Sequence, residues 1–280
     1  MRFLFLPYLS AIAASICYGI ATVLEQMGAR KQADITNLDM FNLVGLLKQL
    51  PYISGIMLDL FGWIFFLIAV RRLPLFLCLS FVAFSLVISS IIDWYIYKVK
   101  IPRYEYFAIL AVLVGIILLG LSAKPTSSTN VNHLFVLLIE LATLPLAIIG
   151  FLVLRNIKNG YSAIILGAFS GLTFGATGII SRFIKFDSLS FKYLFQLPVL
   201  AIIIYGILGM FFLAAALQRD NINRVNSLLY SSELAIPSIL GIMFLGDRVY
   251  DHLWPIMIIG LSLVILGSVI VSLNTEVAKH

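Results

Sequence analysis

The chain has 280 residues, of which 61% are hydrophobic and only 11% are charged, and its formal net charge is +6. A soluble globular domain has roughly 45–50% apolar and about 25% charged residues, so this composition excludes a water-soluble domain and indicates an all-α polytopic membrane protein. The basic residues are scattered along the chain. A nucleic-acid-binding surface would gather them on one face, so we expect no nucleic acid partner.

The amino-terminal segment MRFLFLPYLSAIAA has features of a signal peptide, because one basic residue precedes a short apolar run and several small residues. Its apolar stretch continues to Leu24, however, which is longer than the apolar core of a signal peptide. We therefore interpret this segment as the first membrane span.

Apolar stretches of about twenty residues match the thickness of a bilayer, and nine such stretches follow one another along the chain. Their connections are mostly short, so sequential helices are expected to pack as antiparallel neighbours. The predicted spans are Tyr8–Ala29, Tyr52–Arg71, Leu75–Lys98, Tyr104–Ala123, His133–Arg155, Tyr161–Phe183, Phe195–Leu217, Val225–Gly246 and Leu253–Leu273.

Two connections are longer than the others. Residues 30–51 contain the weakly amphipathic segment LDMFNLVGLLKQL, which is too short and too polar to cross a bilayer and is expected to lie flat in the interface or half inserted. Residues 124–132, KPTSSTNVN, form the only connection rich in turn-forming polar residues. We interpret residues 1–123 as a first transmembrane repeat, 124–132 as a polar linker and 133–280 as a second repeat.

The two parts resemble each other when residues 69–122 are laid over residues 216–269 without gaps, at an offset of 147 residues. The polar and glycine pairs that match are Arg72/Arg219, Ser80/Ser227, Ser85/Ser232 and Gly120/Gly267. The hydropathy of the two segments also agrees. Many secondary transporters are built from such repeats, with the substrate site near the midplane where the repeats meet.

The eighth span carries polar groups that a lipid-facing helix avoids. Glu233 lies near its middle, where a carboxylate costs roughly a few kcal/mol in hydrocarbon. Pro237 follows one turn later; it removes a backbone donor and is predicted to break the helix. Irregular polar backbone is tolerated at this depth only inside protein or against a water-filled cavity, so we expect a polar pathway through the interior.

Two further acids lie well inside predicted spans, Asp59 in the second and Glu140 in the fifth. On the functional interpretation, Asp59 and Glu233 face a central cavity and bind a proton or a cation, and Glu140 is a third pathway candidate. On the structural alternative, these acids are neutral or hydrogen-bonded to a neighbouring helix. Glu25 and Asp93 lie nearer span ends, where acids reach headgroups and water at little cost.

Other side chains near the acids are pathway candidates, each with a structural alternative. Trp63 could stack on a flat or cationic substrate, or fill the core. Asn226, Ser231 and Ser232 bring amide and hydroxyl groups close to Glu233, and they could bind a substrate or bond back to their own helix.

The sixth span contains a GxxxGxxxG pattern formed by Gly167, Gly171 and Gly175. Small residues at every fourth position let two helix backbones approach closely, so we interpret the pattern as a helix-packing surface. A hinge or a cavity wall is the alternative.

The carboxy-terminal part of the chain resembles the drug/metabolite transporter superfamily, which includes EamA-like proteins. The resemblance rests on FLGDR at residues 244–248, on the turn containing Trp254 and on a last span that includes ILGSV, with Asp247 where the superfamily typically has Glu. Residues 53–72 and 158–185 are similar to nine-span NIPA-type magnesium transporters. Leu58–Asp59 stands where those proteins have Gly-Glu, and their Asn-Phe pair is missing.

Sequence patterns of enzymes are missing: there is no GxSxG, no HExxH and no phosphate-binding glycine loop. Cys17 and Cys78 have neither metal-ligand nor disulfide spacing. We therefore expect no enzyme activity and no cofactor.

The resemblance and the midplane acids favour a secondary carrier that moves a small solute by alternating access, coupled to protons. One alternative is a NIPA-like carrier of Mg²⁺ or another divalent cation, with Asp59 and Glu233 as ligands, because Mg²⁺ prefers carboxylate oxygens. A non-transporting scaffold or lipid-handling protein is the other. The expected partners are the lipid bilayer and a small-molecule or cation substrate, and a homodimer is left open.

Charge also predicts an orientation in the plasma (inner) membrane. If the amino terminus lies outside, 11 of the 19 basic residues fall at cytoplasmic ends, as the positive-inside rule favours. We expect the amino terminus outside and the carboxy terminus inside.

Overall fold

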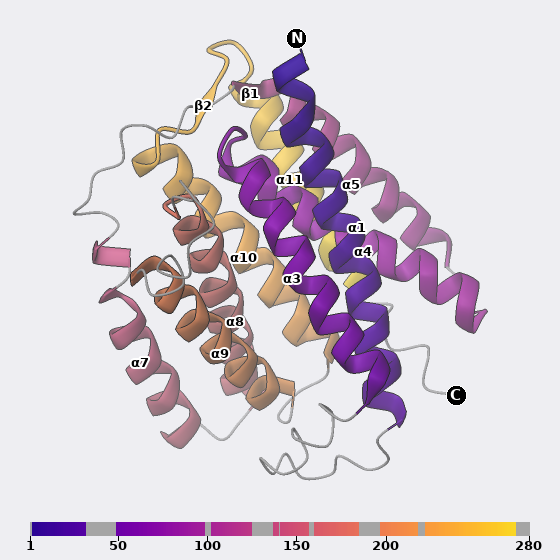
Figure 1. Ribbon diagram of the computed structural model, residues 1–280, viewed down its shortest axis with the longest axis vertical. Coiled ribbons are helices and arrows are strands. Elements are labelled where there is room, and N and C mark those ends of the chain that lie inside the picture. The colour runs from indigo at the N-terminus through magenta and orange to yellow at the C-terminus, as the bar shows by residue number, and fades with distance from the viewer. Residues whose placement is uncertain are drawn as a thin grey trace.

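The computed structural model describes residues 2–31, 49–98, 102–124, 137–139, 141–156, 160–184, 197–217 and 222–272. In these ranges the protein is a bundle of nine helices with one pair of short strands (Figure 1). The helices are α1 (Arg2–Lys31), α3 (Leu50–Val70), α4 (Leu75–Tyr97), α5 (Arg103–Ser122), α7 (Thr143–Asn156), α8 (Gly160–Ser181), α9 (Leu197–Leu217), α10 (Ile222–Phe244) and α11 (Trp254–Ser272). The strands are β1 (Ala123–Lys124) and β2 (Arg248–Val249).

The predicted helical membrane bundle is confirmed in its main feature. Six of the described helices are long and apolar enough to cross a membrane, namely Phe5–Glu25, Leu50–Val70, Leu75–Ile96, Arg103–Ser122, Tyr161–Ser181 and Trp254–Val271. The apolar parts of the other three are shorter, at Leu137–Val153, Leu197–Leu213 and Leu228–Phe244. Nine spans therefore remain a prediction. Most of the predicted interfacial segment (32–48) and of the polar linker (125–132) lies outside the described residues.

Exposed apolar side chains show which surfaces the bundle turns toward lipid. On α1, Phe5, Leu9, Ile12, Ile16 and Ile20 are all exposed, and they recur every three or four residues, which places them on one helical face. A continuous apolar stripe of this kind is costly in water. The stripe is therefore best accounted for by contact with the hydrocarbon of a bilayer.

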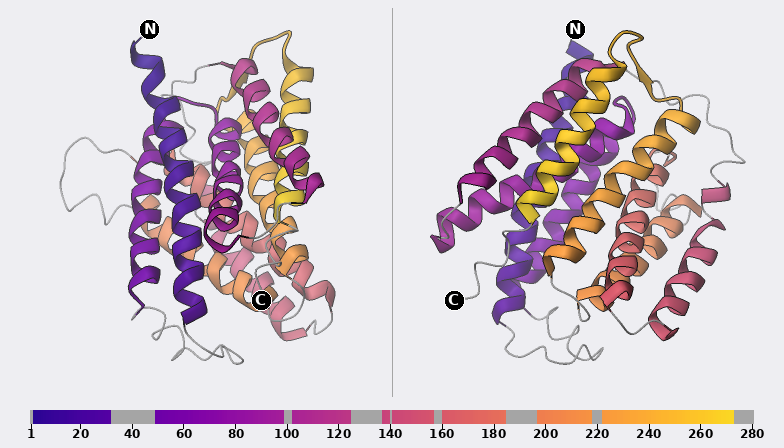
Figure 2. Two further views of the ribbon diagram at one scale, coloured as in Figure 1. Left: turned by 90° about the vertical axis from the view of Figure 1, so that its right-hand side faces the viewer. Right: turned by 180° about the vertical axis from the view of Figure 1, so that it is seen from behind.

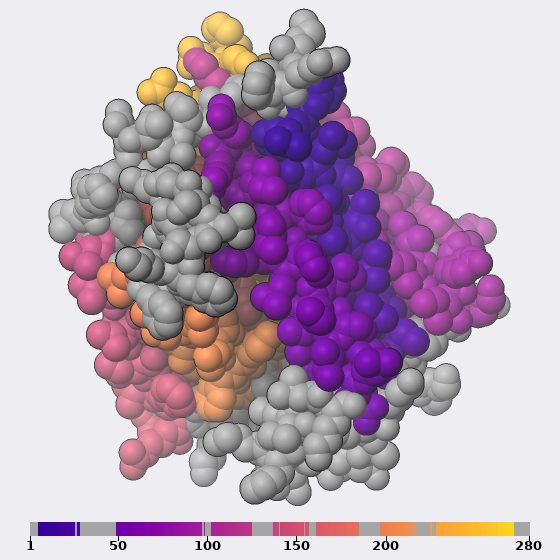
Figure 3. All heavy atoms as spheres, in the orientation of Figure 1, coloured from indigo at the N-terminus to yellow at the C-terminus, as the bar shows by residue number. Residues whose placement is uncertain are grey.

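Eight of the nine described helices pack in two groups of three and one pair, and α7 packs against α8 and α9. α1 packs against α3 and α4, α8 packs against α9 and α10, and α5 packs against α11. Contacts between α4 and α10 join the two groups. Figure 2 shows α5 and α11 side by side behind the bundle, and Figure 3 shows α1 and α3 side by side on its front face.

Several helix ends meet at one end of the bundle, which is uppermost in Figure 1 and is called the upper end below. There β1 pairs antiparallel with β2, with Ala123 opposite Val249, so α5 ends where α11 begins. The N–H of Tyr250 also donates to the carbonyl of Ser122 at 3.1 Å. The largest apolar core surrounds the nearby α3–α4 turn, where Leu73, Leu75, Phe76 and Leu77 are fully buried.

Glycines set the close approach of α1 and α3. An ideal Cβ at Gly55 of α3 would lie 3.0 Å from the carbonyl oxygen of Ala21, and one at Gly28 of α1 would lie 2.6 Å from the Cβ of Tyr52. Larger residues at these positions would push the helices apart. α1 and α3 therefore lie close enough for side chains near their midpoints to meet.

Candidate functional site

The first part of the candidate site is a pair of acids between α1 and α3. Asp59 lies in the middle of α3 and is half-buried, and its carboxyl group lies beside that of Glu25 on α1. Gly55, one turn before Asp59, makes room for this contact, because an ideal Cβ there would lie 2.6 Å from the Cγ of Glu25. Two adjacent carboxyl groups can share a proton through a hydrogen bond when one of them is protonated.

Tyr18 connects this pair with the acid on α10. It lies on α1 about two turns before Glu25, and its ring rests against Gly62 of α3, where an ideal Cβ would lie 2.9 Å from the ring. Its hydroxyl group interacts electrostatically with both Asp59 and Glu233. Tyr18 thus lies within electrostatic range of both acids. The structure also adds Glu25, which the sequence places near a span end.

Glu233 lies at the midpoint of α10 and is half-buried. Among the described residues, neither Glu233 nor Asp59 is paired with a basic side chain. The described residues also contain no group of three or more His, Cys, Asp or Glu side chains that could hold a metal ion. Both acids therefore lie inside the bundle without a basic partner among the described residues.

The three glycines of the GxxxGxxxG pattern lie along the contact between α8 and α10. An ideal Cβ at Gly167 would lie 3.0 Å from the carbonyl oxygen of Val225. At Gly171 it would overlap Leu229 and Ser232, and at Gly175 it would overlap the ring of Pro237. The glycines thereby hold α10, with Glu233, directly against α8.

The prediction that Pro237 breaks the eighth span is wrong, because α10 continues through it as a helix from Ile222 to Phe244. The proline ring fills the space that Gly175 leaves on α8, and the carbonyl of Glu233, which loses its helical donor, also lies against Gly175. Prolines are tolerated inside membrane helices when a neighbouring helix accommodates the freed groups. Packing against α8 therefore keeps the helix continuous.

Two other predicted pathway residues, Trp63 and Ser232, make hydrogen bonds to helices rather than to the acids. Trp63 is half-buried and donates from Nε1 to the Ser181 hydroxyl at 3.2 Å, which joins α3 to the end of α8. The Ser232 hydroxyl lies 2.7 Å from the carbonyl of Leu228 and 3.0 Å from that of Ala168 on α8. Both side chains thus make contacts between or within helices.

The structure describes the last three predicted pathway residues only in part. Ser231 is half-buried on α10. Asn226 belongs to α10, but its side chain lies outside the described atoms, and Glu140 lies outside the described residues altogether.

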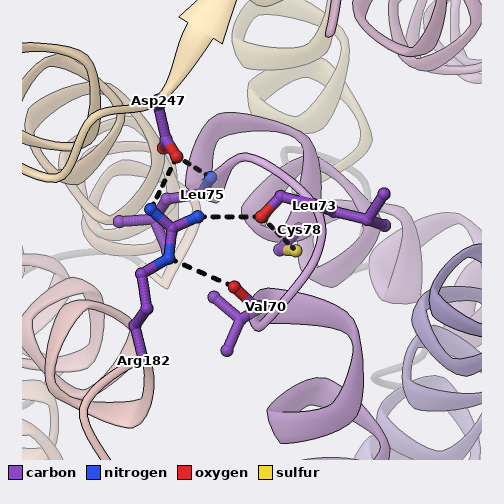
Figure 4. Close-up of polar contacts among 6 residues, drawn as sticks. All are labelled: Val70, Leu73, Leu75, Cys78, Arg182 and Asp247. Atoms are coloured by element: carbon purple, nitrogen blue, oxygen red, sulfur yellow. Dashed lines mark hydrogen bonds and ion pairs between the residues drawn. The ribbon is translucent and has the colours of Figure 1, made fainter. Parts of the chain in front are cut away.

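A second polar cluster, at the upper end, is built around Arg182 and Asp247 (Figure 4). Arg182 directly follows α8, and its Nη1 lies 2.6 Å from Oδ1 of Asp247. Both side chains are buried, with exposed fractions of 1% and 0%. The other two guanidinium nitrogens also donate hydrogen bonds. Nε donates to the carbonyl of Val70 at 3.1 Å, and Nη2 donates to that of Leu73 at 2.8 Å.

Asp247 also caps α4 from a distant part of the chain. Its Oδ2 accepts the N–H of Leu75, the first residue of α4, at 2.6 Å. An acid at a helix amino terminus is favoured by the unpaired N–H groups and by the helix dipole, and Pro74 at the N-cap position has no side-chain cap of its own. Burial raises the pKa of the Asp247 carboxyl, while Arg182 and the Leu75 N–H act against that rise.

Two glycines place the Asp247 carboxylate. Gly241 leaves the space that the carboxylate occupies, because an ideal Cβ there would lie 2.5 Å from Oδ2 of Asp247. Gly246 adopts a φ of +71°, in the left-handed region that glycine enters without strain. The turn it makes brings Asp247 back over the end of α10, where its N–H donates to the carbonyl of Gly241 at 3.1 Å.

Sequence reasoning did not identify this cluster or the role of Tyr18. Asp247 was considered only within the FLGDR segment, and Arg182 was not singled out. The signal that could have joined them is that each is a charge next to a long apolar stretch, on segments 65 residues apart. No known protein family, curated protein or solved structure matches this chain.

Proposed function

We propose that the protein is a membrane carrier that moves a small solute by alternating access and couples this movement to protons held by its midplane acids. The observation that carries the proposal is the position of three acids inside the bundle: Glu25 and Asp59 lie beside each other where Gly55 lets α1 approach α3, and Glu233 lies at the midpoint of α10. Ionisable groups deep in membrane helices most often mark ion or proton pathways. A carboxyl pair that already shares a proton can release it when a cationic or protonated solute binds, and take it up again afterwards.

The spacing of the helices supports a carrier built from two related halves, as in the drug/metabolite transporters that the sequence resembles. α3 runs from residue 50 to 70 and α9 from 197 to 217, so both ends differ by 147 residues. α4 and α10 differ by the same 147 residues at both ends. This spacing equals the offset at which the two halves align in sequence.

The packing partners and directions of the helices also support this architecture. α1, α3 and α4 form one group, and α8, α9 and α10 form the other. α3 ends at the upper end, whereas α9 ends at the opposite end, because only four residues separate it from the start of α10. Repeats with inverted directions are a common plan of secondary transporters, with the substrate site at the interface of the halves.

A divalent-cation carrier is the second candidate. It is favoured by the same pair of carboxyl groups, because Mg²⁺ is usually bound by one or two carboxylates together with retained water. The two candidates differ in the state of these carboxyl groups, since two carboxylates that bind a metal ion together are both deprotonated.

The test uses purified protein in proteoliposomes loaded with a pH-sensitive dye and, in parallel, with a Mg²⁺-sensitive dye. A panel of cationic, neutral and anionic metabolites is applied under an imposed pH gradient. We expect a proton flux that depends on one class of solute and is lost in Asp59→Asn and in Glu233→Gln. Asp251→Asn, in an exposed loop, is the matched control and should transport like the wild type.

Each other outcome changes the proposal. Mg²⁺ entry without a solute-dependent proton flux would replace the proton carrier by the divalent-cation carrier. Transport that survives both substitutions would remove these acids from the mechanism. The absence of any flux would favour the non-transporting scaffold.

A further inference from the structure

The upper end joins the two helix groups by a set of polar contacts. Five hydrogen bonds cross between them: Arg182 to Val70 and to Leu73, Leu75 to Asp247, Arg71 to Ile184 and Trp63 to Ser181. The Arg182–Asp247 ion pair lies within the second group and aims both charges at the α3–α4 turn of the first. We propose that this cluster is the latch of a closed gate, which separates when the upper end opens.

This inference rests on the proposed carrier function, because alternating access requires each end of the pathway to open in turn. The shape of the cluster suits such a gate. Arg182 binds carbonyls at the carboxy-terminal end of α3, and Asp247 binds the N–H at the amino terminus of α4. Each charge therefore meets the helix end of opposite partial charge. These contacts fix one position of the two helix groups relative to each other in the closed state.

An ion pair also suits a contact that must break reversibly. A fully buried pair contributes little net stability, because the cost of removing both charges from water offsets much of their attraction. When water enters, the same charges are rehydrated and their attraction falls steeply with the rising dielectric constant. The pair is therefore firm in the dry, closed state and easily separated once the end is wet.

Cys78 provides a native reporter for the gate. It lies in the first turn of α4, is 1% exposed, and its Sγ lies 3.9 Å from the Leu73 carbonyl that Arg182 also binds. Cys17 is the only other cysteine in the chain. In a Cys17→Ser background, the rate at which a hydrophilic maleimide labels Cys78 in nanodiscs therefore reports exposure beneath the latch.

The expected result is slow labelling of the otherwise wild-type protein and labelling about tenfold faster in Asp247→Asn, because the rate follows the population of the open state. The controls are the exposed neighbours: Asp251→Asn and Arg248→Gln should label like the wild type. If Asp247→Asn does not fold, Arg182→Lys keeps the charge but loses the planar fork, and a smaller increase is expected. An unchanged rate in a folded latch variant would overturn the proposal.

A second reporter separates gating from loosened packing. Tyr52 lies at the opposite end of α3, is half-buried, and interacts electrostatically with Glu25 and Asp59. In a cysteine-free background carrying Tyr52→Cys, opening of the latch should slow labelling at position 52, because the lower end closes as the upper end opens. Faster labelling at both reporters would mean general destabilisation and would also overturn the gate.

The labelling requires no substrate, so its outcome is independent of the flux assay. A reciprocal response at the two reporters without any flux would leave the gate standing and remove the carrier function as formulated. Solute-dependent flux with no change in labelling would support the carrier function and remove the gate.

Discussion

The two acidic regions of this protein differ in what stands opposite the carboxyl groups. At the upper end, Asp247 faces the Arg182 guanidinium and a helix N–H. At mid-depth, Asp59 faces another carboxyl group, that of Glu25, and Glu233 faces no basic side chain among the described residues. The same type of residue therefore faces a basic partner in one region and another acid in the other.

This difference indicates which acid can exchange a ligand. A paired buried charge becomes costly as soon as its partner is removed, so the Arg182–Asp247 cluster defines a conformation. A pair of carboxyl groups that shares a proton can accept or lose that proton, or a cation, without a change of fold. We therefore propose that the upper end sets the conformation and that the acids in the middle of the bundle bind the proton or cation.

The largest expected effect on stability comes from removing one partner of the ion pair. Asp247→Ala should lower the free energy of unfolding by about 3–5 kcal/mol, because Arg182 is left as an unpaired buried charge. Unfolding monitored by circular dichroism in detergent would measure it. Asp251→Ala in the exposed part of the same loop should change stability by less than about 0.5 kcal/mol. Equal effects of the two substitutions would contradict the pairing.

A smaller loss is expected where α8 and α10 touch. Gly175→Ala should cost about 1–3 kcal/mol, because the added methyl group overlaps Pro237 and forces the helices apart. Gly206→Ala on α9 is the control, since no atom lies within 4 Å of its ideal Cβ, and it should be neutral or slightly stabilising. The same unfolding assay distinguishes them, and a destabilised Gly206→Ala would show that loss of glycine itself is the cause.

The turn that positions Asp247 is expected to tolerate one substitution and not another. Gly246→Ala should cost about 1–2 kcal/mol, because its φ of +71° is strained for an alanine. Gly246→Asn should cost less, since asparagine enters the left-handed region more readily. If thermal unfolding shows the same loss for both, then strain at this φ does not explain the glycine.

The smallest effect on stability is expected for the acids that share a proton. Asp59→Asn and Glu25→Gln are near-isosteric and keep a hydrogen-bonding group, so each should change the free energy of unfolding by less than about 1 kcal/mol. Their effect should instead fall on proton flux in proteoliposomes. A loss of stability as large as that of Asp247→Ala would mean that the midplane pair is structural.

Much of the fold could be predicted because bilayer-length apolar stretches carry a strong signal. Helix ends such as Leu50–Val70 and Leu75–Tyr97 lie within a few residues of the predicted spans. The prediction for Pro237 was wrong, because a local rule describes an isolated helix, whereas the ring here fits against Gly175 of α8. The meeting of Glu25 with Asp59 was also missed, because distance from a predicted span end does not show which residues a neighbouring helix brings close.

By itself, the sequence determined that this chain is a membrane-embedded bundle of helices with acids inside them, because hydrophobicity and helix length are properties of each segment alone. Only the tertiary structure decided which acids acquire a partner. Arg182 and Asp247 are 65 residues apart and Glu25 and Asp59 are 34 apart, and no local pattern relates either pair. Their contacts depend on glycines at positions 241 and 55 that let one particular helix approach another. Packing between segments therefore decides that Asp247 meets a basic partner whereas Asp59 meets another acid.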